Sequence, residues 1–235
     1  KSEETDADGI LQHSGYYYKL TRYHGAPKEI PKNLIIFKWQ SYLTFITGML
    51  LLIVIYVYAQ EADRGNWSRF LAGLAFWGMD WFNEIWNSLV FHFTQHAPVW
   101  AAPGDTAFLI FIGLNVEICF MFAISGIVAT LALPKDPKMK VLGLNNRWFF
   151  AILFSMLSVL VEITLNHIGA LTWEWSWWNA DAPWLLFSVG YLSFYSVCYW
   201  VYDMPSRKKQ LQVVGGLYAI NIIAIVVFAG VLGWI

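Results

Sequence analysis

The chain has 235 residues, of which 58% are hydrophobic and only 13% are charged, whereas soluble proteins carry roughly 25% charged residues. This composition excludes an ordinary soluble domain and predicts a polytopic membrane protein that folds as one helical bundle. The net charge of −1 gives no electrostatic support for nucleic-acid binding, so we expect no nucleic-acid partner.

Residues 1–36 are polar and rich in tyrosine, and we predict that they form an extramembrane arm. Pro27 and Pro31 indicate an extended approach of this arm to the membrane. Because the chain begins at Lys1 without an apolar leader, we expect that a segment preceding it has been removed.

Six apolar segments follow the arm, and each is close to the ~20 residues that a bilayer core requires. Every backbone polar group of a spanning segment must be satisfied internally, so we predict an all-α integral membrane bundle of about six transmembrane helices. The predicted helices are approximately residues 37–59, 68–93, 106–132, 148–170, 184–203 and 212–235.

The loops between these segments differ in charge. Loops 60–67, 133–147 and 204–211 together contain eight Lys and Arg, whereas loops 94–105 and 171–183 contain none. This split predicts that the basic loops are cytoplasmic and the other two external, and we expect a bacterial inner membrane. The external loops are rich in tryptophan, which we interpret as an interfacial aromatic belt: Trp100, Trp173, Trp175, Trp177, Trp178 and Trp184.

Residues 13–59 combine a Gly/Tyr-rich loop (HSGYYYKL), an APKEIP stretch and an FKWQSYLTFITG run that leads into the first helix. This stretch resembles part of the N-terminal membrane domain of the bacterial membrane-bound, cytochrome-c-linked urate oxidases, which have glutamate at the position of Gln40. The resemblance covers about a fifth of the chain. It implies an oxidoreductase context, and no activity or functional residue is carried over from it.

The second apolar segment contains a stripe of polar side chains. Asp80, Asn83, Glu84 and Asn87 follow the spacing i, i+3, i+4 and i+7, which places them on one face of a helix. Ionisable groups in hydrocarbon are costly unless they face a bundle interior or a water-filled cavity. The stripe therefore predicts a functional site inside the membrane.

Three successive helices each carry one glutamate in a similar phrase: NEIW at Glu84, VEIC at Glu117 and VEIT at Glu162. Counting 1.5 Å per residue from the outer helix ends places them at depths of roughly 12, 16 and 12 Å. We therefore predict that the three glutamates share one layer, in an outward-opening cavity lined by the second to fifth helices.

Neighbouring carboxyl groups in a medium of low dielectric cannot all be ionised, so such a cavity holds an acid beside a base. This arrangement suits acid–base chemistry on an isoprenoid- or sterol-like substrate. Aromatic side chains in the cavity wall would stabilise the carbocation that forms from the substrate. We predict an enzyme in which Glu84 and Glu162 are the acid–base pair and Asp80 and Glu117 tune them, without a required cofactor. The predicted substrate-binding residues are Asn83, Asn87, Asn166, Trp86, Tyr191 and Tyr195.

Another class of function remains open. His92 and His96 have the i, i+4 spacing of a pair of ligands on one helix face, and His167 could join them at the outer mouth. A transition metal or haem at this place would fit an anchor subunit of a respiratory or oxygenase complex. Coplanar acids could also relay protons, or hold a bundle together by hydrogen bonds in a structural assembly subunit.

Overall fold

The computed structural model describes residues 5–13, 16–23, 34–103 and 106–235, and the chain divides into two units, Lys1–Phe45 and Ile46–Ile235. In the first unit, strand β1 (Thr5–His13) pairs antiparallel with β2 (Tyr16–Tyr23), with His13 opposite Tyr16. The tyrosine-rich sequence of β2 favours a strand, which the prediction of a polar arm did not specify. Pro27 and Pro31 lie outside the described residues.

The second unit is a helical bundle, and the predicted class of helical integral membrane protein is confirmed. By length and composition, the described helices Ser41–Asp63, Asn146–His167 and Arg207–Val231 could each cross a membrane. π-Helical turns η1 (Leu186–Leu192) and η2 (Val226–Val231) lead into α5 and continue α6, respectively. The α-helices are α1 (Leu34–Asp63), α2 (Trp67–Thr94), α3 (Val116–Leu131), α4 (Asn146–His167), α5 (Ser193–Tyr202) and α6 (Arg207–Ile225).

The third helix is much shorter than predicted. Residues expected to begin it form instead an antiparallel hairpin of β3 (Leu109–Phe111) and β4 (Leu114–Asn115). The Asn115 side chain accepts a hydrogen bond from the Ile118 amide at 2.8 Å, so it caps a helix that begins at Val116. The prediction of a helix from residue 106 is therefore wrong.

Helix α4 begins in the same way. Strands β5 (Lys140–Val141) and β6 (Leu144–Asn145) form a short hairpin, and the Asn145 side chain accepts a hydrogen bond from the Arg147 amide at 2.8 Å. Both hairpins place the sequence Gly-Leu-Asn directly before the helix, at residues 113–115 and 143–145. A capping asparagine thus sets the start of each helix.

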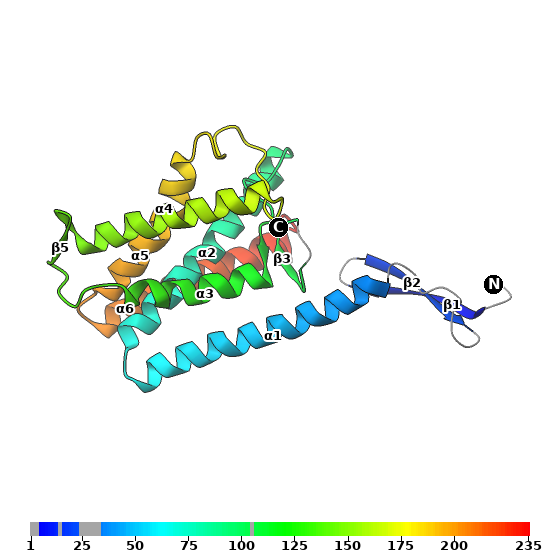
Figure 1. Ribbon diagram of the computed structural model, residues 1–235, viewed down its shortest axis with the longest axis horizontal. Helices are drawn as coiled ribbons and strands as arrows, with labels where there is room; N and C mark the ends of the chain where they lie inside the picture. The colour runs from blue at the N-terminus through cyan, green and yellow to red at the C-terminus, as the bar shows by residue number, and fades with distance from the viewer. Residues whose placement is uncertain (1–4, 14–15, 24–33, 104–105) are drawn as a thin grey trace. The chain divides into compact units, whose positions relative to one another are not determined.

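Helix α2 is the central element of the bundle, because it packs against α3, α5 and α6 (Figure 1). Its Phe76 contacts Phe194 and Tyr195 of α5, with ring centroids 5.4 and 5.0 Å apart. Gly73 of α2 and Gly126 of α3 allow these two helices to approach closely, as small residues do in membrane bundles. A polar stripe on so central a helix necessarily meets other helices.

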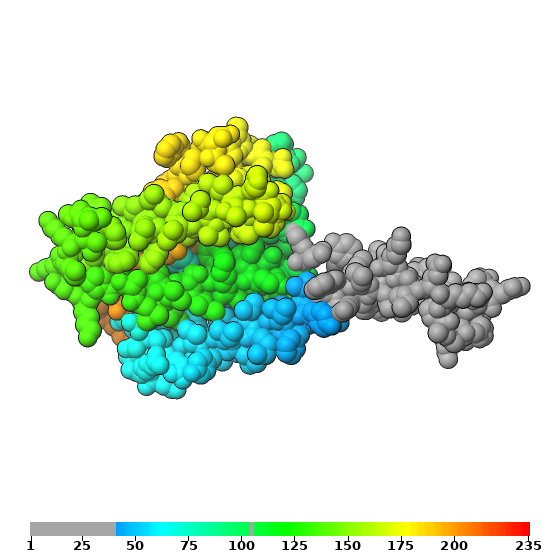
Figure 2. Space-filling model, viewed as in Figure 1, coloured from blue at the N-terminus to red at the C-terminus, as the bar shows by residue number. Residues whose placement is uncertain are grey.

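Helices α3 and α4 lie side by side on the face seen in Figure 2, where parts of deeper helices are visible between them. Many outward-facing side chains of the bundle are apolar and exposed, as contact with a lipid bilayer requires. Examples are Tyr56 on α1, Leu160 on α4 and Ile223 on α6.

Candidate functional site: a carboxyl-lined cavity

The polar stripe of α2 faces the interior of the bundle. Asp80 and Glu84 are only 2% and 3% exposed, and Asn83 and Asn87 are also buried. Burial follows from the helical spacing, since all four share the side of α2 that the neighbouring helices cover. The prediction that these residues avoid lipid is consistent with their positions.

Asp80, Asn83 and Glu84 line one cavity of about 70 Å³ together with Glu162 of α4. A space of this size holds a few water molecules. Two of the three predicted glutamates and Asp80 therefore meet at one place. The remaining lining residues are Trp100, Gly113, Ile118, Met121, Phe122, Leu165, Leu171, Trp178, Gly190, Tyr191 and Phe194.

Indole groups hold the two glutamates. Trp100 Nε1 donates a hydrogen bond to Glu84 Oε1 at 2.7 Å, and Trp173 Nε1 donates one to Glu162 Oε1 at 3.1 Å. Tyr191 lines the same cavity as Glu162. Neutral donors thus orient both carboxyl groups while leaving part of each available to a ligand.

Three buried polar atoms at the cavity have no hydrogen-bond partner within the described part of the chain. They are Asp80 Oδ2, Glu84 Oε2 and Trp178 Nε1. A buried polar group without a partner costs roughly 1–3 kcal/mol, and more for a charged group. Two unpaired acceptors and one unpaired donor therefore surround one small space, where water or part of a ligand could pair with them.

Residues 95–103 and 171–183 form a tryptophan roof over this cavity. The two loops join through the Ala101–Thr172 β-bridge, and the indoles of Trp100 and Trp178 stack with centroids 5.4 Å apart. Trp175 Nε1 donates to the carbonyl oxygen of Ala97 and ties the loops together again. Several tryptophans that we interpreted as an interfacial belt are therefore walls or supports of the site.

Asn87 holds the first loop of the roof. Its Oδ1 accepts hydrogen bonds from the amides of Val99 at 2.7 Å and Trp100 at 3.2 Å, and its Nδ2 donates to the Trp100 carbonyl oxygen at 2.8 Å. On the other loop, Asn166 Nδ2 donates to the Leu171 carbonyl oxygen at 3.0 Å. Both asparagines thus position the roof, whereas we had predicted that they bind substrate.

Replacing Asn87 with alanine is expected to loosen the roof. The variant loses three hydrogen bonds and leaves two buried amides unpaired, which should lower the free energy of unfolding by about 2–3 kcal/mol. Hydrogen–deuterium exchange measured by mass spectrometry should rise over residues 97–102. Asn179→Ala, which loses three hydrogen bonds to the backbone of residues 176–182 and none to residues 97–102, is the control. Equal protection of residues 97–102 in wild type and Asn87→Ala would contradict the assignment.

The cavity reaches the surface between α3 and α4. Met121 of α3 is part of its lining and is 48% exposed, and Phe122 and Leu165 beside it are partly buried. The side chains at this mouth are apolar. A molecule dissolved in the bilayer could therefore reach the carboxyl groups sideways, beneath the roof.

Glu117 does not join the other carboxyl groups. It lies in the first turn of α3, where its carboxylate accepts hydrogen bonds from Thr47 of α1, Thr106 and the amide of Ala107. The predicted depth of Glu117 is wrong because α3 begins at Val116. Its contacts join the start of α3 to α1 and to the preceding loop.

Of the predicted substrate-binding residues, Asn83 and Tyr191 line the cavity, whereas Trp86 and Tyr195 do not. Trp86 packs on Trp100, and the Tyr195 hydroxyl bonds with Ser158 at 3.0 Å. Trp86 therefore contacts a residue of the cavity wall, and Tyr195 joins α5 to α4 outside the cavity. Sequence reasoning missed several lining residues whose only signal was their aromatic or small character: Trp100, Gly113, Phe122, Trp178 and Phe194.

The three histidines of the metal interpretation do not come together. His92 stacks on Trp234 with centroids 4.8 Å apart, His96 meets the edge of Trp175, and His167 is exposed at the end of α4. Among the described residues, no group of three or more His, Cys, Asp or Glu is placed to hold a metal ion. The geometry therefore does not support a metal centre built from these histidines.

The fold and the cavity define a helical integral membrane protein with a buried carboxyl-lined site. The chain belongs to an uncharacterized membrane protein family, whose model matches residues 29–230. A relative from Archaeoglobus fulgidus, described as an uncharacterized protein, is 58% identical over 186 residues, which cover 79% of this chain and 88% of the relative.

A second Archaeoglobus fulgidus relative with the same description is 42% identical over 53 residues, 23% of this chain and 95% of the relative. No solved structure matches the chain. Both relatives come from this organism, which is an archaeon, so the expectation of a bacterial inner membrane receives no support from them.

Proposed function

We propose that the protein is a membrane enzyme that moves protons on a lipophilic substrate, with Glu84 and Glu162 as its acid–base pair. The observation that carries the proposal is the set of unpartnered polar atoms around a cavity that three carboxyl groups line. Groups that served only to hold helices together would be expected to bond to one another. Here Asp80 Oδ2 and Glu84 Oε2, from two residues that line the cavity, have no hydrogen-bond partner among the described residues.

The mouth and the volume of the cavity indicate the substrate class. Whole small ligands usually occupy about 300–1,000 Å³, so a cavity of about 70 Å³ takes only the reacting part of a larger molecule. The rest would lie in the bilayer beside Met121 and Leu165. A narrow isoprenoid chain meets this requirement better than the rigid rings of a sterol.

The simplest reaction is a shift of a carbon–carbon double bond. One carboxylic acid donates its proton to an alkene carbon, and the aromatic walls, including Phe122 and Phe194, stabilise the resulting carbocation. The other carboxylate then removes a proton from an adjacent carbon. No other reactant is consumed, and proton transfer between the two sites, in which Asp80 would take part, restores the starting state.

Deuterium incorporation tests this proposal without a known product. Membranes that contain the protein are incubated in D₂O with unsaturated isoprenoid lipids, and the lipids are analysed by mass spectrometry. Wild type should introduce deuterium at carbon, whereas Glu84→Gln and Glu162→Gln should slow this exchange at least about 100-fold, the usual contribution of a general acid or base.

Glu117→Gln is the matched control, because Glu117 is a bundle carboxylate outside the cavity, and this variant should exchange at the wild-type rate. Thermal unfolding of all three variants in detergent verifies that they fold. Wild-type exchange rates in both Glu84→Gln and Glu162→Gln, or no exchange in any sample, would contradict the proposal.

A further inference from the structure

A second pocket, of about 340 Å³, lies between α4 and α5 near the first turn of α4. Its polar wall is Arg147 with Asp203, and Trp148, Ala151 and Trp200 are among its apolar lining. Arg147 precedes Glu162 by 15 residues on α4, or roughly 22 Å along the helix, so this pocket is separate from the carboxyl-lined cavity.

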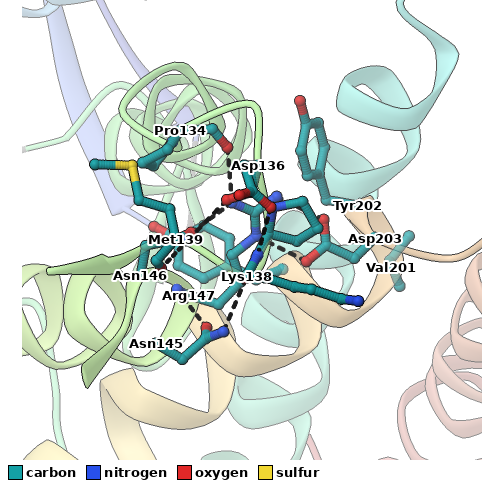
Figure 3. Close-up of polar contacts among 12 residues, drawn as sticks. Pro134, Asp136, Lys138, Met139, Asn145, Asn146, Arg147, Val201, Tyr202 and Asp203 are labelled. Atoms are coloured by element: carbon teal, nitrogen blue, oxygen red, sulfur yellow. Dashed lines mark hydrogen bonds and ion pairs between the residues drawn. The ribbon is translucent and has the colours of Figure 1, made fainter. Parts of the chain in front are cut away.

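The polar wall is held rigidly. Arg147 donates from Nε and Nη2 to the two carboxylate oxygens of Asp203, each at 2.7 Å, and from Nη1 to Pro134 O and Asn146 Oδ1 (Figure 3). These bonds fasten the loop before α4 to the end of α5. They use four of the five guanidinium N–H groups, which leaves one for a ligand.

The charge around this pocket is strongly positive. Segments 133–147 and 203–211, which contribute lining residues, contain seven Lys and Arg against two Asp and Glu, an excess of five positive charges. The roof at the other end of the bundle, by contrast, contains no Lys or Arg. Basic residues beside a membrane attract anionic lipid headgroups.

The apolar side of the pocket is continuous with the exposed apolar surface of the bundle. Trp148 and Trp200 are 55% and 58% exposed although they line the pocket. Tryptophan is enriched where a membrane meets water, because its ring is apolar and its N–H is polar. A hydrocarbon chain between the two rings, over Ala151, would continue directly into the bilayer.

We propose that this pocket binds one anionic phospholipid. The phosphate meets the remaining N–H of Arg147 within the positive field of the loops, and a hydrocarbon chain lies between Trp148 and Trp200. The volume of the pocket suits the headgroup region of one lipid. The inference is independent of the reaction proposed for the carboxyl-lined cavity.

Native mass spectrometry of the full chain in detergent tests the proposal, with phosphatidylglycerol, phosphatidylcholine and inorganic phosphate as separate probes. Wild type should retain one phosphatidylglycerol with at least about 10-fold preference over phosphatidylcholine, and inorganic phosphate should not displace it. Ser196→Trp, which fills the pocket, and Trp148→Ala, which removes one wall, should each lower this retention about 10-fold.

Trp184→Ala is the matched control, because Trp184 is 74% exposed and precedes η1 at the roof end of the bundle. This variant should retain phosphatidylglycerol as wild type does. Wild-type retention in Trp148→Ala, equal retention of the two phospholipids, or displacement by inorganic phosphate would overturn the proposal. Trp148→Ala keeps the test decisive if Ser196→Trp fails to fold.

Discussion

Replacing Gly126 with valine is expected to destabilise the bundle more than any other single substitution at its glycines. A Cβ atom at this position would lie 2.5 Å from Phe76 Cβ and 3.0 Å from Gly73 Cα, and backbone atoms cannot move aside as a flexible side chain can. Overpacking of this kind costs about 3 kcal/mol. The melting temperature should therefore fall by about 6–12 °C.

Gly216→Val on α6 is the matched control, because a Cβ atom there would meet no other atom within 4 Å. It carries the same change in helix propensity, so the difference between the two variants isolates the contact between α2 and α3. Circular dichroism during heating in one detergent measures both. Equal melting temperatures of the two variants would show that α2 and α3 do not pack as described.

Two buried carboxyl groups are expected to respond to substitution with opposite signs. Glu61 accepts hydrogen bonds from Arg69 Nη1 and Asn66 Nδ2, both at 2.9 Å, and Arg64 lies 3.5 Å away. Replacing Glu61 with methionine removes the carboxylate partner of Arg69, which keeps its hydrogen bond to Thr130, and should lower the free energy of unfolding by about 3 kcal/mol.

Asp80→Leu should instead raise the free energy of unfolding by about 1 kcal/mol, because it removes a buried group whose Oδ2 has no partner among the described residues. Denaturant titration of both variants in the same detergent measures the two changes. A loss of stability in Asp80→Leu as large as in Glu61→Met would mean that Asp80 holds the bundle together. A gain would mean that the carboxyl group is kept despite its cost, as expected of a functional group.

The helical periodicity of α2 predicted much of the site. The spacing of Asp80, Asn83 and Glu84 requires one common face, and the cost of burying such groups in lipid requires that this face point inward. Glu162 was predicted from a different signal, the short phrase that it shares with Glu84 and Glu117, and of these three Glu84 and Glu162 line the cavity. The placement of the α2 residues was predictable because residues close in sequence determine helical spacing by themselves.

Glu117 shows where local reasoning fails. Residues 106–115 are apolar enough to resemble the start of a helix, but Gly113 lies in the turn of a hairpin there, and Asn115, at the end of that hairpin, caps α3. The depth of Glu117 depends on that starting point, so an error in one helix boundary moved it into the wrong layer. The capping asparagine was a signal that could have placed the boundary correctly.

By itself, the sequence determined that this is a helical membrane protein with an inward-facing acidic stripe, because hydrophobicity and helical spacing are local properties. Only the tertiary structure decided which groups share the cavity. Trp100 and Trp173 bond to Glu84 and Glu162 from two different loops, and the Ala101–Thr172 β-bridge joins these loops. That closure depends on side-chain packing and hydrogen bonds between segments distant in sequence, and neither composition nor periodicity records such contacts.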